Sequence, residues 1–182
     1  MSLKTKTRRI ALLGLLTSLA LILGYVEHLV PISSIPGIKL GLSNAVLLYA
    51  LYFLDIKSTI ALMVLKVALS GVLFGSGVSV LYSFVGGVLS VIAMIMLKRF
   101  DKVSVIGVSV AGAAMHNVGQ IAVACFLVQT HVIIAYLPVL LIAAVISGVL
   151  TGTIGKLVLR YTGAHKSKTA DSSDDSGKTD VQ

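Results

Sequence analysis

Six apolar stretches separated by short polar connections take up almost the whole chain, and they limit its fold more than any other feature. A helix needs about 20 apolar residues to cross the hydrocarbon core of a bilayer. A chain of 182 residues can therefore hold roughly six such crossings. Hydrophobic residues make up 57% of the chain and charged residues 12%, and the mean hydropathy is +1.01. The sequence predicts an all-α integral membrane protein and leaves no room for a sizeable soluble catalytic domain.

The apolar stretches define one membrane domain over residues 1–163. We expect its six transmembrane helices at about 9–27, 41–54, 58–74, 78–97, 104–128 and 133–160. The first stretch follows basic residues as a signal peptide does, but it lacks a small-x-small cleavage site, and we interpret it as an uncleaved helix. Residues 164–182 are rich in Lys, Ser, Thr, Asp and Gly, which bury too little apolar surface to become ordered. They are predicted to form a disordered cytoplasmic tail.

Basic residues flank alternate connections between the apolar stretches. They are Lys4, Lys6, Arg8, Arg9, Lys57, Lys98, Arg99, Lys102, Lys156 and Arg160. Because Lys and Arg concentrate in cytoplasmic loops, this pattern predicts a multi-pass plasma-membrane protein with both termini in the cytoplasm. The net charge of +8 also raises nucleic acid as a partner, but the chain has no tryptophan, no aromatic-rich basic strand and no basic recognition helix. Nucleic acid is therefore not an expected partner.

Two prolines interrupt the chain between the first two expected helices. Pro31 and Pro36 forbid a continuous helix. We therefore expect a Pro-containing outer loop over residues 31–39, which is either re-entrant or lies on the surface. At membrane depth an irregular backbone survives only where protein or trapped water satisfies it. The loop is a candidate lid or pocket wall.

Lys66 is the most costly residue of the expected bundle. It follows Lys57 by nine residues, about 13 Å along a helix, and so lies close to the bilayer midplane. A lysine at a helix centre costs about 2.5–3.5 kcal/mol unless it faces a cavity, a carboxylate, a carbonyl or a bound anion. This depth favours a substrate-binding role. The alternative is a lysine that snorkels to the interface or is neutral because burial lowers its pKa.

The densest polar group of any expected helix is His116, Asn117 and Gln120. Their spacing places all three on an arc of about 100° of the fifth helix. We expect this face to contact a ligand. The alternative is interhelical hydrogen bonding that only stabilises the bundle.

Further candidate residues lie near the outer loop. Glu27 ends the first helix, and Lys39 and Asn44 lead into the second. Lys39 is the stronger candidate, because the N-terminus of a short helix has free N–H groups and a positive dipole that suit an anion. Interfacial anchoring is the alternative for all three. Ser83 of the fourth helix is a lesser candidate for the pocket.

Small residues predict close contacts between helices. Gly148xxxGly152 and the segment Ser83–Ser90, which contains Gly86 and Gly87, allow two backbones to approach closely. The single cysteine, Cys125, permits no intramolecular disulfide and no cysteine metal cluster. We predict no catalytic residue, no metal site and no cofactor in this chain.

Three segments together resemble a known membrane family. They are Pro36–Asn44 (PGIKLGLSN), Ser83–Ser90 (SFVGGVLS) and Gly112–Gln120 (GAAMHNVGQ). The chain resembles the heptaprenyl diphosphate synthase component I family, also called the Gx transporter family, over roughly residues 8–160. That family is similar to the S components of energy-coupling factor (ECF) transporters.

The resemblance implies a six-helix subunit that binds a small-molecule substrate from outside and docks on an ECF T protein with two ATPases. Small residues of the first helix would contact the T protein, and Ala11, Gly14 and Ser18 are available for this, although a strict alanine pair at four-residue spacing is missing. The resemblance and the candidate residues together suggest an anionic and partly apolar substrate, such as an isoprenoid or quinone precursor.

The enzymatic part of the family name conflicts with the acidic residues of the chain. Prenyl diphosphate synthases hold magnesium through aspartate-rich motifs, because that ion requires oxygen ligands. Paired aspartates occur here only in the tail, at Asp174 and Asp175. We therefore expect no enzyme activity and place ATP hydrolysis in the partner subunits. The alternative function is a noncatalytic accessory subunit of isoprenoid or quinone (heptaprenyl diphosphate) biosynthesis.

Overall fold

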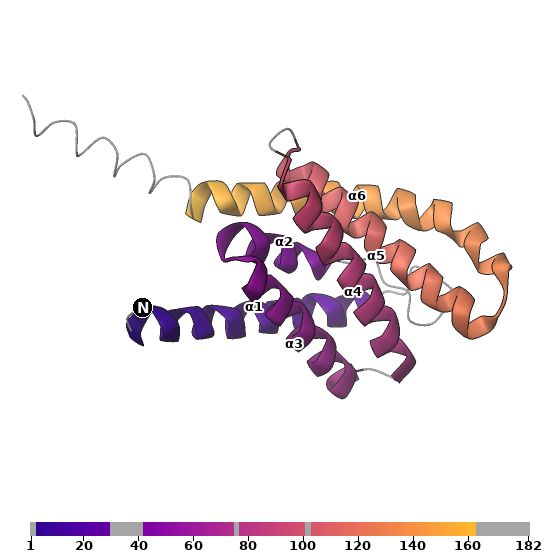
Figure 1. Ribbon diagram of the computed structural model, residues 1–182, viewed down its shortest axis with the longest axis horizontal. Helices are drawn as coiled ribbons and strands as arrows, with labels where there is room; N and C mark the ends of the chain where they lie inside the picture. Colours follow the sequence, from indigo (N-terminus) through magenta and orange to yellow (C-terminus); the bar gives the residue numbers. More distant parts are fainter. Residues whose placement is uncertain (1–2, 30–41, 75–76, 101–102, 163–182) are drawn as a thin grey trace, which may run out of the picture.

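The computed structural model describes residues 3–29, 42–74, 77–100 and 103–162, and within these ranges it is helical and contains no strand. The helices, shown in Figure 1, are α1 (Leu3–Leu29), α2 (Asn44–Phe53), α3 (Ile56–Phe74), α4 (Gly77–Lys98), α5 (Val105–Val128), the 3-10 helix η1 (His131–Tyr136) and α6 (Leu137–Thr162). The predicted all-α class is confirmed. The outer loop 31–39 and the tail 164–182 lie outside the described residues, and they stay predictions.

In the part of the chain that the structure describes, five helices are long and apolar enough to cross a membrane, but α2 is not long enough. Helix α2 has ten residues and is about 15 Å long, half the thickness of a hydrocarbon core of about 30 Å. The helix expected at 41–54 is present, but with ten residues it is too short to be a crossing of its own and reaches only half-way across a bilayer. The protein is a multi-pass membrane protein, and its described residues contain five helices that are long enough to span a bilayer and one short apolar helix.

The short helix α2 lies at the centre of the bundle. It contacts α1, α3, α4, α5 and α6, whereas these five long helices pack on one another in the order α1–α3–α4–α5–α6. Among the described residues, α1 and α6 make no contact with each other. The long helices thus form an open ring around α2, with its opening between α1 and α6 (Figure 1).

The sequence of α2 explains its enclosed position. Its residues are apolar on every side, and Val46, Leu47, Leu48, Ala50 and Leu51 are all buried. A helix that is apolar all round is stable only when it is surrounded by other apolar groups. The side chains packed around it form the main core, to which α1, α3, α4 and α5 contribute Leu16, Ala20, Leu62, Met63, Val67, Val91, Met94 and Val108.

Glycines bring α4, α5 and α6 into close contact. A Cβ atom at Gly86 would lie 2.8 Å from the carbonyl oxygen of His116, and one at Gly148 would lie 2.6 Å from the Cα atom of Val110. No side chain larger than that of glycine fits at such distances without a shift of backbone. The predicted packing role of Gly86 and Gly148 is confirmed.

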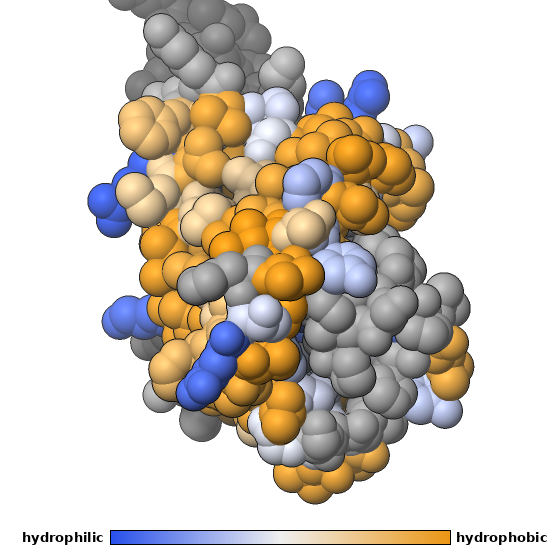
Figure 2. All heavy atoms as spheres, turned by 90° about the vertical axis from the view of Figure 1, so that its right-hand side faces the viewer, coloured by the Kyte–Doolittle hydropathy of each residue, from blue (hydrophilic) through white to orange (hydrophobic). Residues whose placement is uncertain are grey.

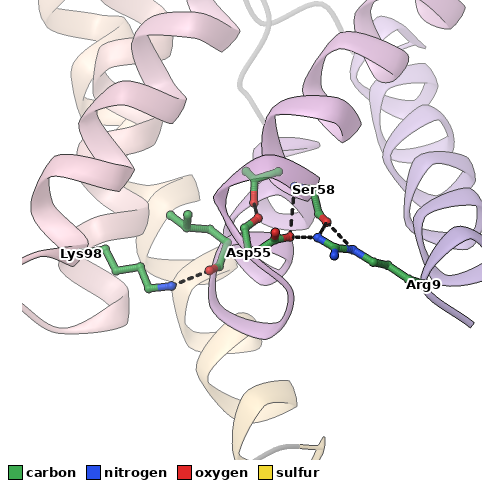
Figure 3. Close-up of polar contacts among 6 residues, drawn as sticks. Arg9, Asp55, Ser58 and Lys98 are labelled. Carbon is green, nitrogen blue, oxygen red and sulfur yellow. Dashed lines mark hydrogen bonds and ion pairs between the residues drawn. The ribbon is translucent and has the colours of Figure 1, made fainter. Parts of the chain in front are cut away.

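Polar contacts join several helices at one end of the bundle (Figure 3). Arg9 of α1 pairs with the Asp55 carboxylate and donates hydrogen bonds of 3.1 and 2.7 Å to the Ser58 hydroxyl oxygen. The same carboxylate accepts a hydrogen bond from the Ser58 backbone N–H at 3.1 Å, which makes Asp55 the N-cap of α3. The Lys98 ammonium at the end of α4 donates to the Leu51 carbonyl oxygen at 2.6 Å.

The C-terminal part of α6 reaches the same end. A Cβ atom at Gly152 would lie 2.9 Å from the Cα atom of Ile106, which is in the first turn of α5. We call this end of the bundle the basic end; its bases include Arg8, Arg9, Lys57, Lys98, Arg99, Lys156 and Arg160. The clustering expected from the charge pattern is therefore present in the structure.

The outer surface of the bundle is apolar. Exposed side chains include Val72, Ile10 and Val139, at 85%, 70% and 62% exposure. Viewed from the end opposite the basic end, most of the coloured surface is hydrophobic (Figure 2). Apolar surface of this extent requires lipid or protein around it.

Candidate functional site

Lys66 is buried near the middle of α3. Only 8% of the residue is exposed, and it lies about 15 Å along the helix from Ile56. Its ammonium group donates a hydrogen bond to the Asn44 side-chain oxygen at 3.3 Å. The structure thus supplies a polar partner for this lysine on the first residue of α2, in the interior of the bundle.

Glu27 joins the end of α1 to the start of α2. It is 7% exposed, and its carboxylate accepts hydrogen bonds from the Leu42 backbone N–H and from the Ser43 hydroxyl, the latter at 3.3 Å. A carboxylate at a helix N-terminus is stabilised by the unpaired N–H groups and by the helix dipole. The anion position expected at the start of this short helix is therefore occupied by a side chain of the protein itself.

A small polar cavity lies between these groups. Its volume is about 20 Å³, and its walls are formed by Ala20, Gly24, Glu27, Ser43, Lys66, Ser70, Ser83 and His116. This volume has room for about one water molecule. Four predicted site residues, from α1, α3, α4 and α5, meet at this cavity, and a fifth, Asn44, is hydrogen-bonded to one of them.

Asn44 keeps a free donor beside this cavity. Its side-chain oxygen accepts from Lys66, while its side-chain nitrogen is buried without a hydrogen-bond partner among the described residues. A buried donor without a partner costs about 1–3 kcal/mol. An oxygen atom of a ligand would satisfy it.

Two serines of the cavity were missed by the sequence analysis. Ser70 follows Lys66 by four residues, and Ser43 directly precedes Asn44. Residues four apart lie on the same face of a helix. That spacing alone would have identified Ser70 once Lys66 was selected.

The other two polar residues of α5 lie elsewhere in the interior. Asn117 and Gln120 are fully buried, but neither lines the cavity. The Asn117 side-chain nitrogen donates to the Leu140 carbonyl oxygen of α6 at 2.8 Å. Asn117 therefore makes the interhelical hydrogen bond of the alternative interpretation, while its side-chain oxygen has no partner among the described residues and its ligand contact stays a prediction. Lys39 lies outside the described residues.

The predicted partner surface on α1 is accessible. Ala11, Gly14 and Ser18 are all exposed. A Cβ atom at Gly14 would meet nothing within 4 Å, and the Ser18 hydroxyl donates to the Gly14 carbonyl oxygen at 3.0 Å. The identity of the partner stays a prediction.

No metal centre accompanies these groups in the described part of the chain. Within it, His, Cys, Asp and Glu side chains form no cluster of three or more that could hold an ion.

Comparison with known proteins identifies the family. The model of the family described as heptaprenyl diphosphate synthase component I matches residues 16–158. The chain belongs to this family. The matched range contains every wall residue of the polar cavity, so the candidate site is part of the shared domain of heptaprenyl diphosphate synthase component I proteins. No curated protein and no solved structure matches the chain.

Proposed function

We propose that this chain is the substrate-binding membrane subunit of an ECF-type importer for a small molecule with an anionic group and an apolar body. The observation that supports it is the buried Lys66 ammonium beside a polar cavity to which four helices contribute. A lysine at this depth costs about 2.5–3.5 kcal/mol, and ionisable residues inside membrane helices commonly mark substrate or ion pathways. An isoprenoid or quinone precursor has the required combination of groups.

In this proposal Lys66 neutralises the carboxylate or phosphate of the substrate. The free Asn44 donor binds a further oxygen atom, and Ser83 and His116 orient polar atoms. The cavity of about 20 Å³ has to widen to accept a substrate. The Glu27 side chain moves away when the substrate binds, because the anionic group of the substrate replaces its carboxylate beside the start of α2. Lys39 would add a second positive charge.

The energy for import comes from other subunits. ATP is hydrolysed by two ATPases, and a T protein docks against Ala11, Gly14 and Ser18 of α1, while this chain has no enzyme activity. The basic end faces the cytoplasm of a cell whose plasma membrane contains the chain, in agreement with the positive-inside rule. Both termini are then cytoplasmic, and the polar cavity lies in the outer half of the membrane.

Copurification tests this function. The tagged full-length chain is purified from its native membranes in mild detergent, and mass spectrometry identifies the proteins and small molecules that accompany it. We expect a T protein, two ATPases and an enriched anionic small molecule. Lys66→Met should lose the small molecule, whereas Lys57→Met, an exposed lysine of the same helix, should retain it. Equal retention by the two variants would remove the main support for the proposal.

The family description favours a second candidate function, a noncatalytic membrane accessory subunit of heptaprenyl diphosphate biosynthesis. In that case the same purification recovers a prenyl synthase subunit and no ATPases. His116→Ala then weakens the complex, and there is no bound small molecule to lose.

A further inference from the structure

A groove lies in the opening of the helix ring, between α1 and α6. Its volume is about 530 Å³, its floor is α2, and its walls include Leu15 and Leu19 of α1 and Leu150 and Ile154 of α6. The Thr151 hydroxyl in this lining is already hydrogen-bonded, to Ser147 and Ser109 of the bundle. The groove therefore presents an almost wholly apolar surface.

The length of this groove fits one leaflet of a bilayer. Its wall on α1 runs from Leu15 to Leu23, and its wall on α6 runs from Leu150 to Val158. Each wall spans about 12 Å of helix. The hydrocarbon thickness of one leaflet is about 15 Å, half of the bilayer core. A single hydrocarbon chain can thus lie along the groove for most of its length.

A second hollow continues the groove at the basic end. Its volume is about 610 Å³, and its lining includes Arg8, Arg9, Phe53 and Asp55. Tyr49 lines both hollows, and its ring stacks on Phe53 with the ring centroids 5.1 Å apart. Tyrosine rings favour the boundary between hydrocarbon and headgroups. The two hollows therefore meet at Tyr49, and we call them together the channel, which is apolar between α1 and α6 and carries arginines at the basic end.

The charges of the second hollow favour an anion. Two arginines face one carboxylate there. Arg9 is paired with Asp55, whereas Arg8 has no ion pair within the described part of the chain. A guanidinium group can donate two hydrogen bonds to two oxygens of one phosphate. Basic pockets beside membrane helices bind anionic lipid headgroups.

We propose that this channel binds one anionic phospholipid of the leaflet at the basic end, with an acyl chain between α1 and α6 and its phosphate at Arg8 and Arg9. The site is separate from the Glu27–Lys66 cavity, because the groove and the cavity use different residues of α1. It is also independent of the proposed import function, since it needs neither a substrate nor an ATPase.

The test uses native mass spectrometry of the purified full-length chain. Phosphatidylglycerol and phosphatidylcholine with identical acyl chains are added in turn, so that only the headgroup charge differs. We expect one phosphatidylglycerol to remain bound where phosphatidylcholine dissociates. Arg8→Gln should weaken this binding about fivefold, the effect of one basic residue at an anionic headgroup. Arg99→Gln, an exposed arginine at the end of α4, is the matched control and should leave the binding unchanged.

A second pair of variants tests the groove itself. Ala45 lies on its floor, so that Ala45→Phe should block the acyl chain and release the lipid. Val145→Phe adds the same ring at a position of α6 that is 48% exposed and outside the groove. If Ala45→Phe fails to fold, Ala45→Leu replaces it. Three outcomes would each overturn the proposal. They are equal retention of both lipids, equal effects of the two arginine variants, and unchanged lipid binding after the groove is filled.

Discussion

The ammonium nitrogen of Lys66 lies 3.3 Å from the side-chain oxygen of Asn44, so the middle of α3 is joined to the first residue of α2. Both residues are buried. This link and the carboxylate of Glu27 both hold the start of α2, beside the small polar cavity.

Asn44→Leu should lower the free energy of unfolding by about 1–3 kcal/mol, because the buried ammonium of Lys66 then loses an acceptor. The double variant Asn44→Leu/Lys66→Met should recover part of this loss, since the buried lysine that needs the acceptor is no longer there. Thermal unfolding in one fixed detergent compares the stability of the wild type and the two variants. A double variant that is no more stable than Asn44→Leu would contradict the expected coupling.

Glu27→Ala should loosen the start of α2, because the Leu42 N–H and the Ser43 hydroxyl lose their acceptor. We expect a loss of about 1 kcal/mol in the local stability of this helix end. Hydrogen exchange of the amides of α2 measures the effect. Glu27→Gln keeps an acceptor oxygen and serves as the control, which should exchange more slowly than Glu27→Ala.

Asp55 should make the protein more sensitive to acid. The Ser58 hydroxyl and Arg9 beside it hold the pKa of Asp55 below its ordinary value of 3.8. A lowered folded-state pKa contributes stability above the unfolded-state value, and this stability is lost as the pH falls through the folded-state value. Since the side chain is 40% exposed, the contribution should stay below about 1 kcal/mol.

Ser58→Ala tests this assignment. It should raise the pKa of Asp55 toward 3.8, as followed by the carboxyl carbon resonance in NMR, and make the loss of stability below about pH 4 smaller. An unchanged Asp55 titration in Ser58→Ala would show that the hydroxyl does not set the pKa.

Gly86→Ala should destabilise the protein by about 1–3 kcal/mol, because the new methyl group would lie 2.8 Å from the His116 carbonyl oxygen and push α4 from α5. Gly14→Ala is the control, since a Cβ atom there meets nothing within 4 Å. Its stability should remain equal to that of the wild type or rise by up to about 1 kcal/mol through helix propensity. Thermal unfolding distinguishes the two variants.

Gly14→Leu should leave folding intact and weaken the recovery of a T protein and ATPases at least severalfold, because contacts between membrane helices require small residues. Val139→Leu changes another exposed position, on α6 at 62% exposure, and should not affect recovery. Quantitative mass spectrometry of the purified complexes provides the comparison. Undiminished recovery with Gly14→Leu would exclude this face of α1 as the contact.

The cost of polar groups in a membrane explains why much of the site could be predicted. Lys66, Glu27, Ser83 and His116 were selected as polar residues among apolar ones, and the structure brings them to one cavity. The role of Asn117 could not be inferred in this way, because it depends on where the Leu140 carbonyl lies on a different helix. The same holds for the Arg9–Asp55 ion pair, whose members are 46 residues apart.

Hydropathy predicted the residue ranges of the helices better than it predicted which helix lies at the centre of the bundle. The five long helices agree with their expected ranges to within several residues. The central position of α2 was not predictable, because Leu and Val residues have the same pattern whether they face lipid or protein. Its shortness was predictable, because the expected range 41–54 is the shortest of the six.

The enclosure of α2 has a consequence for how the protein is made. A ribosome releases the chain from its N-terminus, so α2 enters the membrane before α4, α5 and α6, which supply much of its surroundings. Until then, a helix of ten residues that cannot span the bilayer has only α1 and α3 to cover it. The final seating of α2 must therefore wait for the insertion of α6, the last helix described. Assembly of the interior is thus among the last events of biosynthesis, although its central helix is among the first segments to be synthesised.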